Sequence, residues 1–236
     1  MPAPTSYRTL DPQQVIGTSE KLLARIAARF PGSGLASVAA DLVRACRDTA
    51  GRAEQIGRPY LALRVLVFAV IAAGLCAQAY LVGSLRPTFH AGADVFGLAQ
   101  GAEAALNLLL LSAGGAWFLL TAEERWKRNR IQHWLNELRA FAHVIDMHQL
   151  TKDPTAADGP RTAASPDRAM TRFELARYLD YCAEMLSLTG KLAAIYAGES
   201  GDHVAITAAG EVEELCSNLN RKIWQKIMIL AEPQDA

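Results

Sequence analysis

Two long stretches without a charged side chain constrain this sequence more than any other feature. The first covers residues 65–85 (VLVFAVIAAGLCAQAYLVGSL) and the second covers residues 104–122 (AALNLLLLSAGGAWFLLTA). A helix rises 1.5 Å per residue, so each stretch is long enough to cross ~30 Å of hydrocarbon. The polar N-terminus before the first stretch is unlike a cleaved secretory signal. The sequence therefore predicts a transmembrane hairpin, and a buried hairpin in a soluble core is the alternative.

Basic residues beside the two stretches predict the orientation of the hairpin. The segment between the stretches carries a single basic residue of the Lys or Arg type, Arg86. Lys and Arg collect on the cytoplasmic side of membrane proteins. We therefore expect a multi-pass protein of the bacterial inner membrane, with both termini in the cytoplasm. The basic residues on the cytoplasmic side are Arg52, Arg58, Arg64, Arg125, Lys127, Arg128 and Arg130.

Polar residues inside the apolar stretches are the candidate functional residues. Gln100, Glu103 and Asn107 have the spacing i, i+3 and i+7, so they share one helix face, which continues to Gly114. This face is a candidate lining for a pore in an oligomer, with Glu103 favouring cations at the outer mouth. Alternatively, Gln78 and Asn107 form hydrogen bonds between helices and Glu103 lies at headgroup level.

Helical periodicity on both sides of the hairpin predicts an all-α protein with a helical cytoplasmic bundle. Residues 152–167 contain three prolines and no apolar anchor, which is typical of a linker. The expected parts are cytoplasmic N-terminal helices in 1–60, the hairpin in 61–122 (spans about 64–85 and 103–122, external loop 86–102), a cytoplasmic extension of the second span in 123–150, a flexible linker in 151–168 and a C-terminal helical pair in 169–231.

The extension after the second span carries an apolar stripe that predicts assembly. Trp134, Leu138, Phe141 and Ile145 recur at three- and four-residue steps, and no Gly or Pro interrupts residues 117–152. One continuous helix from about residue 103 to 150 is expected. Its coiled-coil-like stripe needs a partner, which is either the C-terminal helices or another subunit.

Signatures of catalysis are missing from the sequence. It has no phosphate-binding loop, no nucleophile elbow and no zinc-protease motif. His143, Asp146 and His148 lack the spacing that a metal site on a helix prefers. The formal net charge is +0, which gives nucleic acid no basic surface. We expect a protein that is not an enzyme, with no cofactor, no metal, no nucleic-acid partner and reduced cysteines.

The layout resembles the SLATT family of bacterial two-transmembrane proteins. The resemblance covers residues 35–150 and rests on Leu61–Leu85, the short loop, Ala104–Ala122 and the segment EERWKRNRIQHWLNELRAFAHVIDMH. It implies a membrane effector in bacterial stress or anti-phage defence, beside systems that use nucleotide second messengers. The helical segment 171–230 goes beyond the basic layout of that family.

Two functional hypotheses follow. In the first, the protein is a homo-oligomeric membrane effector or channel whose hairpins surround the Gln100, Glu103 and Asn107 face. In the second, it is a non-conducting membrane anchor or scaffold whose cytoplasmic helices bind a partner protein. Replacement of Glu103 separates them, because only the channel needs that carboxylate.

Overall fold

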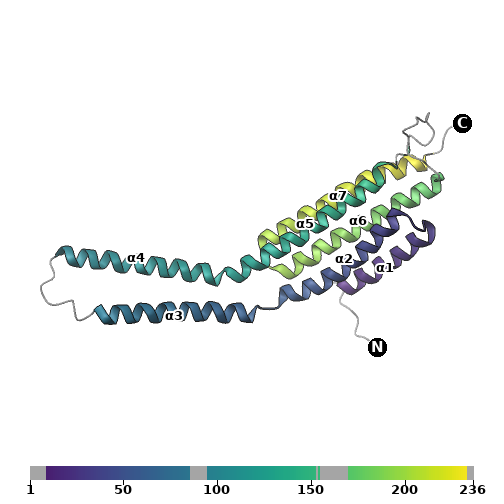
Figure 1. The fold of residues 1–236 in the computed structure, drawn as a ribbon. Helices are drawn as coiled ribbons and strands as arrows, with labels where there is room; N and C mark the ends of the chain where they lie inside the picture. The colour runs from purple at the N-terminus through teal and green to yellow at the C-terminus, as the bar shows by residue number, and fades with distance from the viewer. Residues whose placement is uncertain (1–8, 86–94, 153, 155–169, 233–236) are drawn as a thin grey trace. The chain divides into compact units, whose positions relative to one another are not determined.

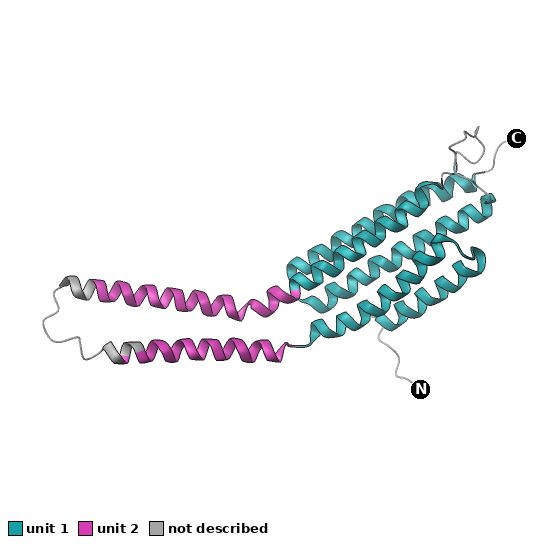
Figure 2. Cartoon of the chain, in the orientation of Figure 1, with its two compact units in different colours: residues 1–58, 128–236 teal, residues 59–127 magenta. Residues whose placement is uncertain are grey.

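The computed structural model describes residues 9–85, 95–152, 154 and 170–232, and this part of the chain is helical with no strand (Figure 1). The prediction of an all-α fold is confirmed for these residues. The chain divides into two compact units, which are residues 1–58 with 128–236 (unit 1) and residues 59–127 (unit 2) (Figure 2). The helices are α1 (Pro12–Arg29), α2 (Gly34–Gly57), α3 (Leu61–Leu85), α4 (Val95–Leu120), α5 (Ala122–Leu150), α6 (Arg172–Ser200) and α7 (His203–Ala231).

Side chains at the helix starts explain where several helices of unit 1 begin. The Asp11 carboxylate accepts a hydrogen bond from the Gln13 amide at 2.9 Å and caps α1. Thr171 and Glu174 form the capping box that the sequence predicts at the start of α6, with the Thr171 amide donating to Glu174 Oε2 at 2.8 Å. Such caps satisfy amides that have no partner within the first turn.

Helix α6 is the central helix of unit 1, and fifteen of its residues are buried. It packs along α7, α2 and α1. The α6–α7 connection is short because Gly201 adopts a left-handed conformation with φ 59°. The apolar pattern predicts an end of α6 near Tyr196, but the helix continues through Gly198 to Ser200. A glycine weakens a helix by only ~1 kcal/mol, and the packing of α6 outweighs that cost.

The apolar stripe of α5 packs within its own chain. Trp134, Leu138 and Ile145 are buried in the core of unit 1, and Phe141 packs against that core half-buried. The Trp134 ring stacks on Tyr196 of α6 with centroids 5.5 Å apart. Of the two partners that the sequence allows for this stripe, the structure places the helices of the same chain against it.

Unit 2 contains α3 and α4, which run antiparallel beside each other. Two expectations need correction here. The sequence pattern assigns residues 95–102 to the external loop, but α4 already begins at Val95. The pattern also predicts one continuous helix from residue 103 to 150, but Thr121 lies in a turn that separates α4 from α5. The Thr121 hydroxyl donates to the carbonyl of Trp117 at 3.0 Å, and hydrogen bonds of this kind often bend helices.

Candidate membrane site in the α3–α4 hairpin

Among the described residues, a polar pair lies on the inner face of the hairpin. Gln78 of α3 donates a hydrogen bond from Nε2 to the Ser112 hydroxyl of α4, and that hydroxyl donates to the Leu108 carbonyl at 2.6 Å. Val67, about three turns from Gln78 on the same face of α3, is buried. The polar atoms of Gln78 and Ser112 are thus paired between the two helices, and Ser112 marks the side of α4 that faces α3.

The polar stripe of α4 lies on the opposite side of this helix. Counted from Ser112 at ~100° per residue, Gln100, Glu103, Asn107 and Gly114 lie roughly 120° to 180° around the helix axis. All four residues are exposed. The side chains of Gln100, Glu103 and Asn107 form neither a hydrogen bond nor an ion pair with any described residue. The structure therefore brings these residues onto one face, and that face points away from α3.

Apolar side chains cover most of the remaining surface of the hairpin. Leu111 is 76% exposed and Trp117 is 73% exposed. The two helices are long and apolar enough to cross a membrane, and almost none of their apolar windows is buried inside the chain. Each carries one charged residue, Arg64 in α3 and Glu103 in α4. Soluble proteins rarely leave an apolar surface of this extent in contact with water.

A compact ionic cluster joins the two ends of the hairpin. The Glu123 carboxylate, 11% exposed, accepts hydrogen bonds from Arg64 Nε at 2.6 Å and from the Tyr60 amide at 3.2 Å. Lys127 Nζ lies 3.1 Å from the same carboxylate. The hydrogen bond from Arg64 is the main reason that the pKa of Glu123 is lowered to about 2; Lys127 and Tyr60 add to this, and burial opposes it.

The histidine segment of α5 does not converge into a site. His143 is exposed, and Asp146 accepts a hydrogen bond from Gln149 on the same helix. The His148 ring turns toward α6, where its Nδ1 lies 3.5 Å from the Tyr178 hydroxyl. Over the described residues, no group of three or more His, Cys, Asp or Glu side chains gathers as metal ligands would.

The cysteines have different surroundings in the two units. Cys46, Cys182 and Cys216 are buried in unit 1, and Cys76 is exposed on α3. All four are free thiols. Burial raises the pKa of Cys182 to about 12, so this thiol stays protonated and unreactive at neutral pH.

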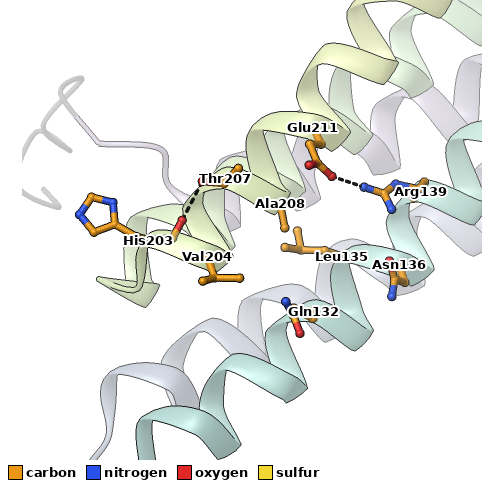
Figure 3. Close-up of a pocket in the computed structure, with 9 residues that line it drawn as sticks. All are labelled: Gln132, Leu135, Asn136, Arg139, His203, Val204, Thr207, Ala208 and Glu211. Carbon is orange, nitrogen blue, oxygen red and sulfur yellow. Dashed lines mark hydrogen bonds and ion pairs between the residues drawn. The ribbon is translucent and has the colours of Figure 1, made fainter.

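A groove of about 560 Å³ lies between α5 and α7 in unit 1 (Figure 3). Its apolar lining includes Leu135 of α5 and Ala208 of α7, and the carboxamide of Gln132 of α5 also lines it. Arg139 Nη2 and Glu211 Oε2 form an ion pair of 2.7 Å across it. Because these two charges neutralise each other, the groove has no net charge with which to select an ionic ligand.

Two residues of the hairpin are not identified by the sequence patterns. Ser112 pairs with Gln78, and its polarity inside the second apolar stretch is the available signal. Glu123 accepts hydrogen bonds from three donors at the base of the hairpin, and the signal is an acid directly after one span with Arg64 at the same end of the other.

The sequence predicts Gln78 and Asn107 as partners in an interhelical contact, but the two side chains do not meet. Gln78 faces Ser112, and Asn107 faces outward.

The chain was compared with family models, curated proteins and solved structures. No family model, no curated protein and no solved structure matches the chain.

Proposed function

We propose that the protein is a homo-oligomeric membrane effector of the channel type. The α3–α4 hairpin crosses the bacterial inner membrane, both termini lie in the cytoplasm, and the α4 faces of several copies surround a polar path. One observation carries this proposal: Gln100, Glu103 and Asn107 are exposed on the side of α4 that points away from α3. Polar groups facing lipid are costly, so a polar stripe in that position favours a water-filled path or another copy.

The proposed path has a defined order of side chains. Glu103 lies one helical turn from Asn107, toward the outer end of α4. In a parallel ring, the carboxylates of all copies gather at one level and favour cations there. Gly114 adds no side chain further along the same face. The proposed path therefore selects cations at its outer mouth.

The resemblance to SLATT proteins supports the biological part of the proposal, a role in bacterial stress or anti-phage defence. In this role, the five helices of unit 1 are the cytoplasmic part that receives a signal. The groove between α5 and α7 favours the second candidate function, a non-conducting anchor whose cytoplasmic helices bind a partner protein.

The first experiment measures the mass of the full chain in nanodiscs, followed by ion conductance in planar bilayers. We expect a discrete oligomer of at least four copies, because a dimer has too few helices to enclose a path. Glu103→Gln should lower the preference for cations over anions, whereas Glu124→Gln, which changes an exposed acid of α5, should not. A monomer or dimer, or an oligomer without conductance, contradicts the channel and favours the anchor.

A further inference from the structure

Among the described residues of its own hairpin, the side chain of Asn107 has no partner. Asn107 lies in the middle of α4 (Val95–Leu120), between apolar neighbours, and it is exposed. No described residue forms a hydrogen bond with its carboxamide. The side-chain amide of α3, Gln78, cannot reach it, because Gln78 pairs with Ser112 on the far side of α4.

The depth of Asn107 in the membrane makes the lack of a hydrogen-bond partner energetically unfavourable. The uncharged stretch 104–122 is centred on Ala113, so in a hairpin that crosses the bilayer Asn107 lies about 9 Å outward of the centre, still inside the ~30 Å of hydrocarbon. An amide without hydrogen bonds costs several kcal/mol in such surroundings. Gln100 and Glu103 precede this stretch at its outer end, where headgroups and water can solvate them. Asn107 is therefore the residue of the stripe that most needs a protein partner.

A second copy of this chain supplies a matching partner. Copies inserted with the same topology present Asn107 at the same depth. A carboxamide has both donor and acceptor atoms, so identical side chains can satisfy each other. The Glu103 carboxylate cannot do this when ionised, because it only accepts hydrogen bonds and repels its copies. Asn107 thus suits direct contact between copies, and Glu103 suits a hydrated position.

We propose that the Asn107 carboxamides of neighbouring copies hydrogen-bond to one another and hold the α4 helices together in the membrane. This inference rests on the proposed homo-oligomer and names the contact that forms it. Each amide N–H donates to the amide oxygen of the next copy, which closes a ring around the polar path. Glu103 then lines a wider, hydrated part of the path one turn further out.

The test combines the mass of the full chain in detergent with cysteine cross-linking. Asn107→Leu should weaken association about tenfold, the effect of one hydrogen bond between membrane helices. Asn107→Gln, which keeps the carboxamide, should restore the oligomer. Ser112→Ala is the matched control, because it removes a polar group that faces α3, and it should leave the mass unchanged.

Cross-linking keeps the proposal testable if Asn107→Leu fails to insert. In a Cys76→Ser background, Asn107→Cys should form an inter-chain disulfide on oxidation. Leu109→Cys lies roughly 160° around the helix and should not. An Asn107→Leu protein with wild-type mass, or equal cross-linking at both positions, overturns the contact. If Asn107→Leu also conducts like the wild type, the channel proposal stands without the Asn107 contact. If the wild-type oligomer does not conduct but dissociates on Asn107→Leu, the Asn107 contact stands and the channel proposal fails.

Discussion

Gly34, at the start of α2, has less space around it than any other described glycine. A Cβ atom built there would lie 2.9 Å from Cε1 of His148, which is closer than carbon atoms normally approach. We predict that Gly34→Ala lowers the free energy of unfolding by about 1 kcal/mol, because the imidazole must move away from Tyr178. Thermal unfolding of the full chain in detergent, followed by circular dichroism, measures this.

Gly51 provides the matched control for that substitution. It lies inside the same helix, and an added Cβ would meet nothing within 4 Å. Gly51→Ala should therefore stabilise the protein by up to ~1 kcal/mol through helix propensity alone. The double variant Gly34→Ala/His148→Ala should lose the steric part of the penalty. Equal rises in melting temperature for the two alanine variants would show that the contact with His148 is unimportant.

Glu123 makes the stability of the hairpin base depend on pH. Its pKa is lowered to about 2 in the folded chain, from an ordinary value of 4.5. The ionised carboxylate therefore stabilises the fold fully above pH ~4.5, and this stabilisation disappears as the pH falls toward 2. We predict that Glu123→Gln is less stable than the wild type at pH 7, with a difference that shrinks below pH ~4.5.

The measurement is the free energy of unfolding of the wild type and of Glu123→Gln across this pH range. The difference between the two proteins isolates this carboxylate, because all other acids titrate in both. Glu124→Gln changes a neighbouring exposed acid and should leave the pH profile as in the wild type. A stability difference between wild type and Glu123→Gln that stays constant from pH 7 to pH 2 contradicts the role given to Arg64 and Lys127.

Single residues also show what periodicity can and cannot predict. The spacing of Gln100, Glu103 and Asn107 is sufficient to place them on one helix face. It cannot reveal whether that face meets α3, because this depends on how α4 rotates against its neighbour. Ser112 fixes that rotation through Gln78. The polarity of Ser112 inside an apolar stretch is visible in the sequence, but the local sequence does not identify Gln78 as its partner.

Among the helices, α7 depends most clearly on one side chain at its start. Asp202 Oδ1 accepts hydrogen bonds from the amides of Val204 at 2.9 Å and Ala205 at 3.1 Å, and Oδ2 lies 2.7 Å from Arg128 Nη2. We predict that Asp202→Ala speeds hydrogen exchange in the first turn of α7 about fivefold, which corresponds to the ~1 kcal/mol of a typical N-cap. Mass spectrometry of the exchanged full chain measures it.

Asp202→Asn separates the two roles of this residue. The Asn side chain keeps a capping oxygen but loses the charge that pairs with Arg128. Exchange in the first turn of α7 should then stay close to that of the wild type. The loss of the ion pair should appear instead as faster exchange in α5 around Arg128. Unchanged exchange in Asp202→Ala argues against the capping role.

Element boundaries are predictable where a side chain or glycine marks them. Thr171 with Glu174, and Pro12 after Asp11, mark helix starts in the sequence and in the structure. The start of α4 at Val95 does follow a typical capping residue, Asp94, but the polar residues spread over 86–103 favour a loop for the same segment. The turn at Thr121 escapes prediction for a similar reason, because one threonine inside a helical pattern seldom ends it.

At the scale of the whole molecule, the charged flanks and the apolar hairpin differ in where their apolar side chains lie. Unit 1 buries its apolar stripes inside five helices, and unit 2 exposes most of its apolar side chains. The amino-acid composition of the two regions is sufficient to predict this contrast. The partner of the α5 stripe is not predictable in the same way, because the same apolar pattern fits α6 of the same chain and a helix of another copy.

Each unit contains two of the four tryptophans, and these test where each unit lies. Trp117 is 73% exposed and Trp126 is 59% exposed in unit 2, whereas in unit 1 Trp134 is 7% exposed and Trp224 is 54% exposed. In single-tryptophan variants in lipid vesicles, with phenylalanine at the other three positions, acyl-chain-brominated lipids should quench Trp117 strongly. Trp126, which follows α4, should be quenched less, because it lies nearer the headgroups.

The tryptophans of unit 1 serve as internal controls for this experiment. Trp224 should be quenched by aqueous iodide and not by brominated lipids, and Trp134 should respond weakly to both because it stacks on Tyr196. Circular dichroism of each variant checks that the helices remain. If iodide quenches Trp117 as strongly as Trp224, the hairpin lies in water. If neither iodide nor brominated lipid quenches Trp117, other copies of the chain cover the exposed apolar surface of α3 and α4.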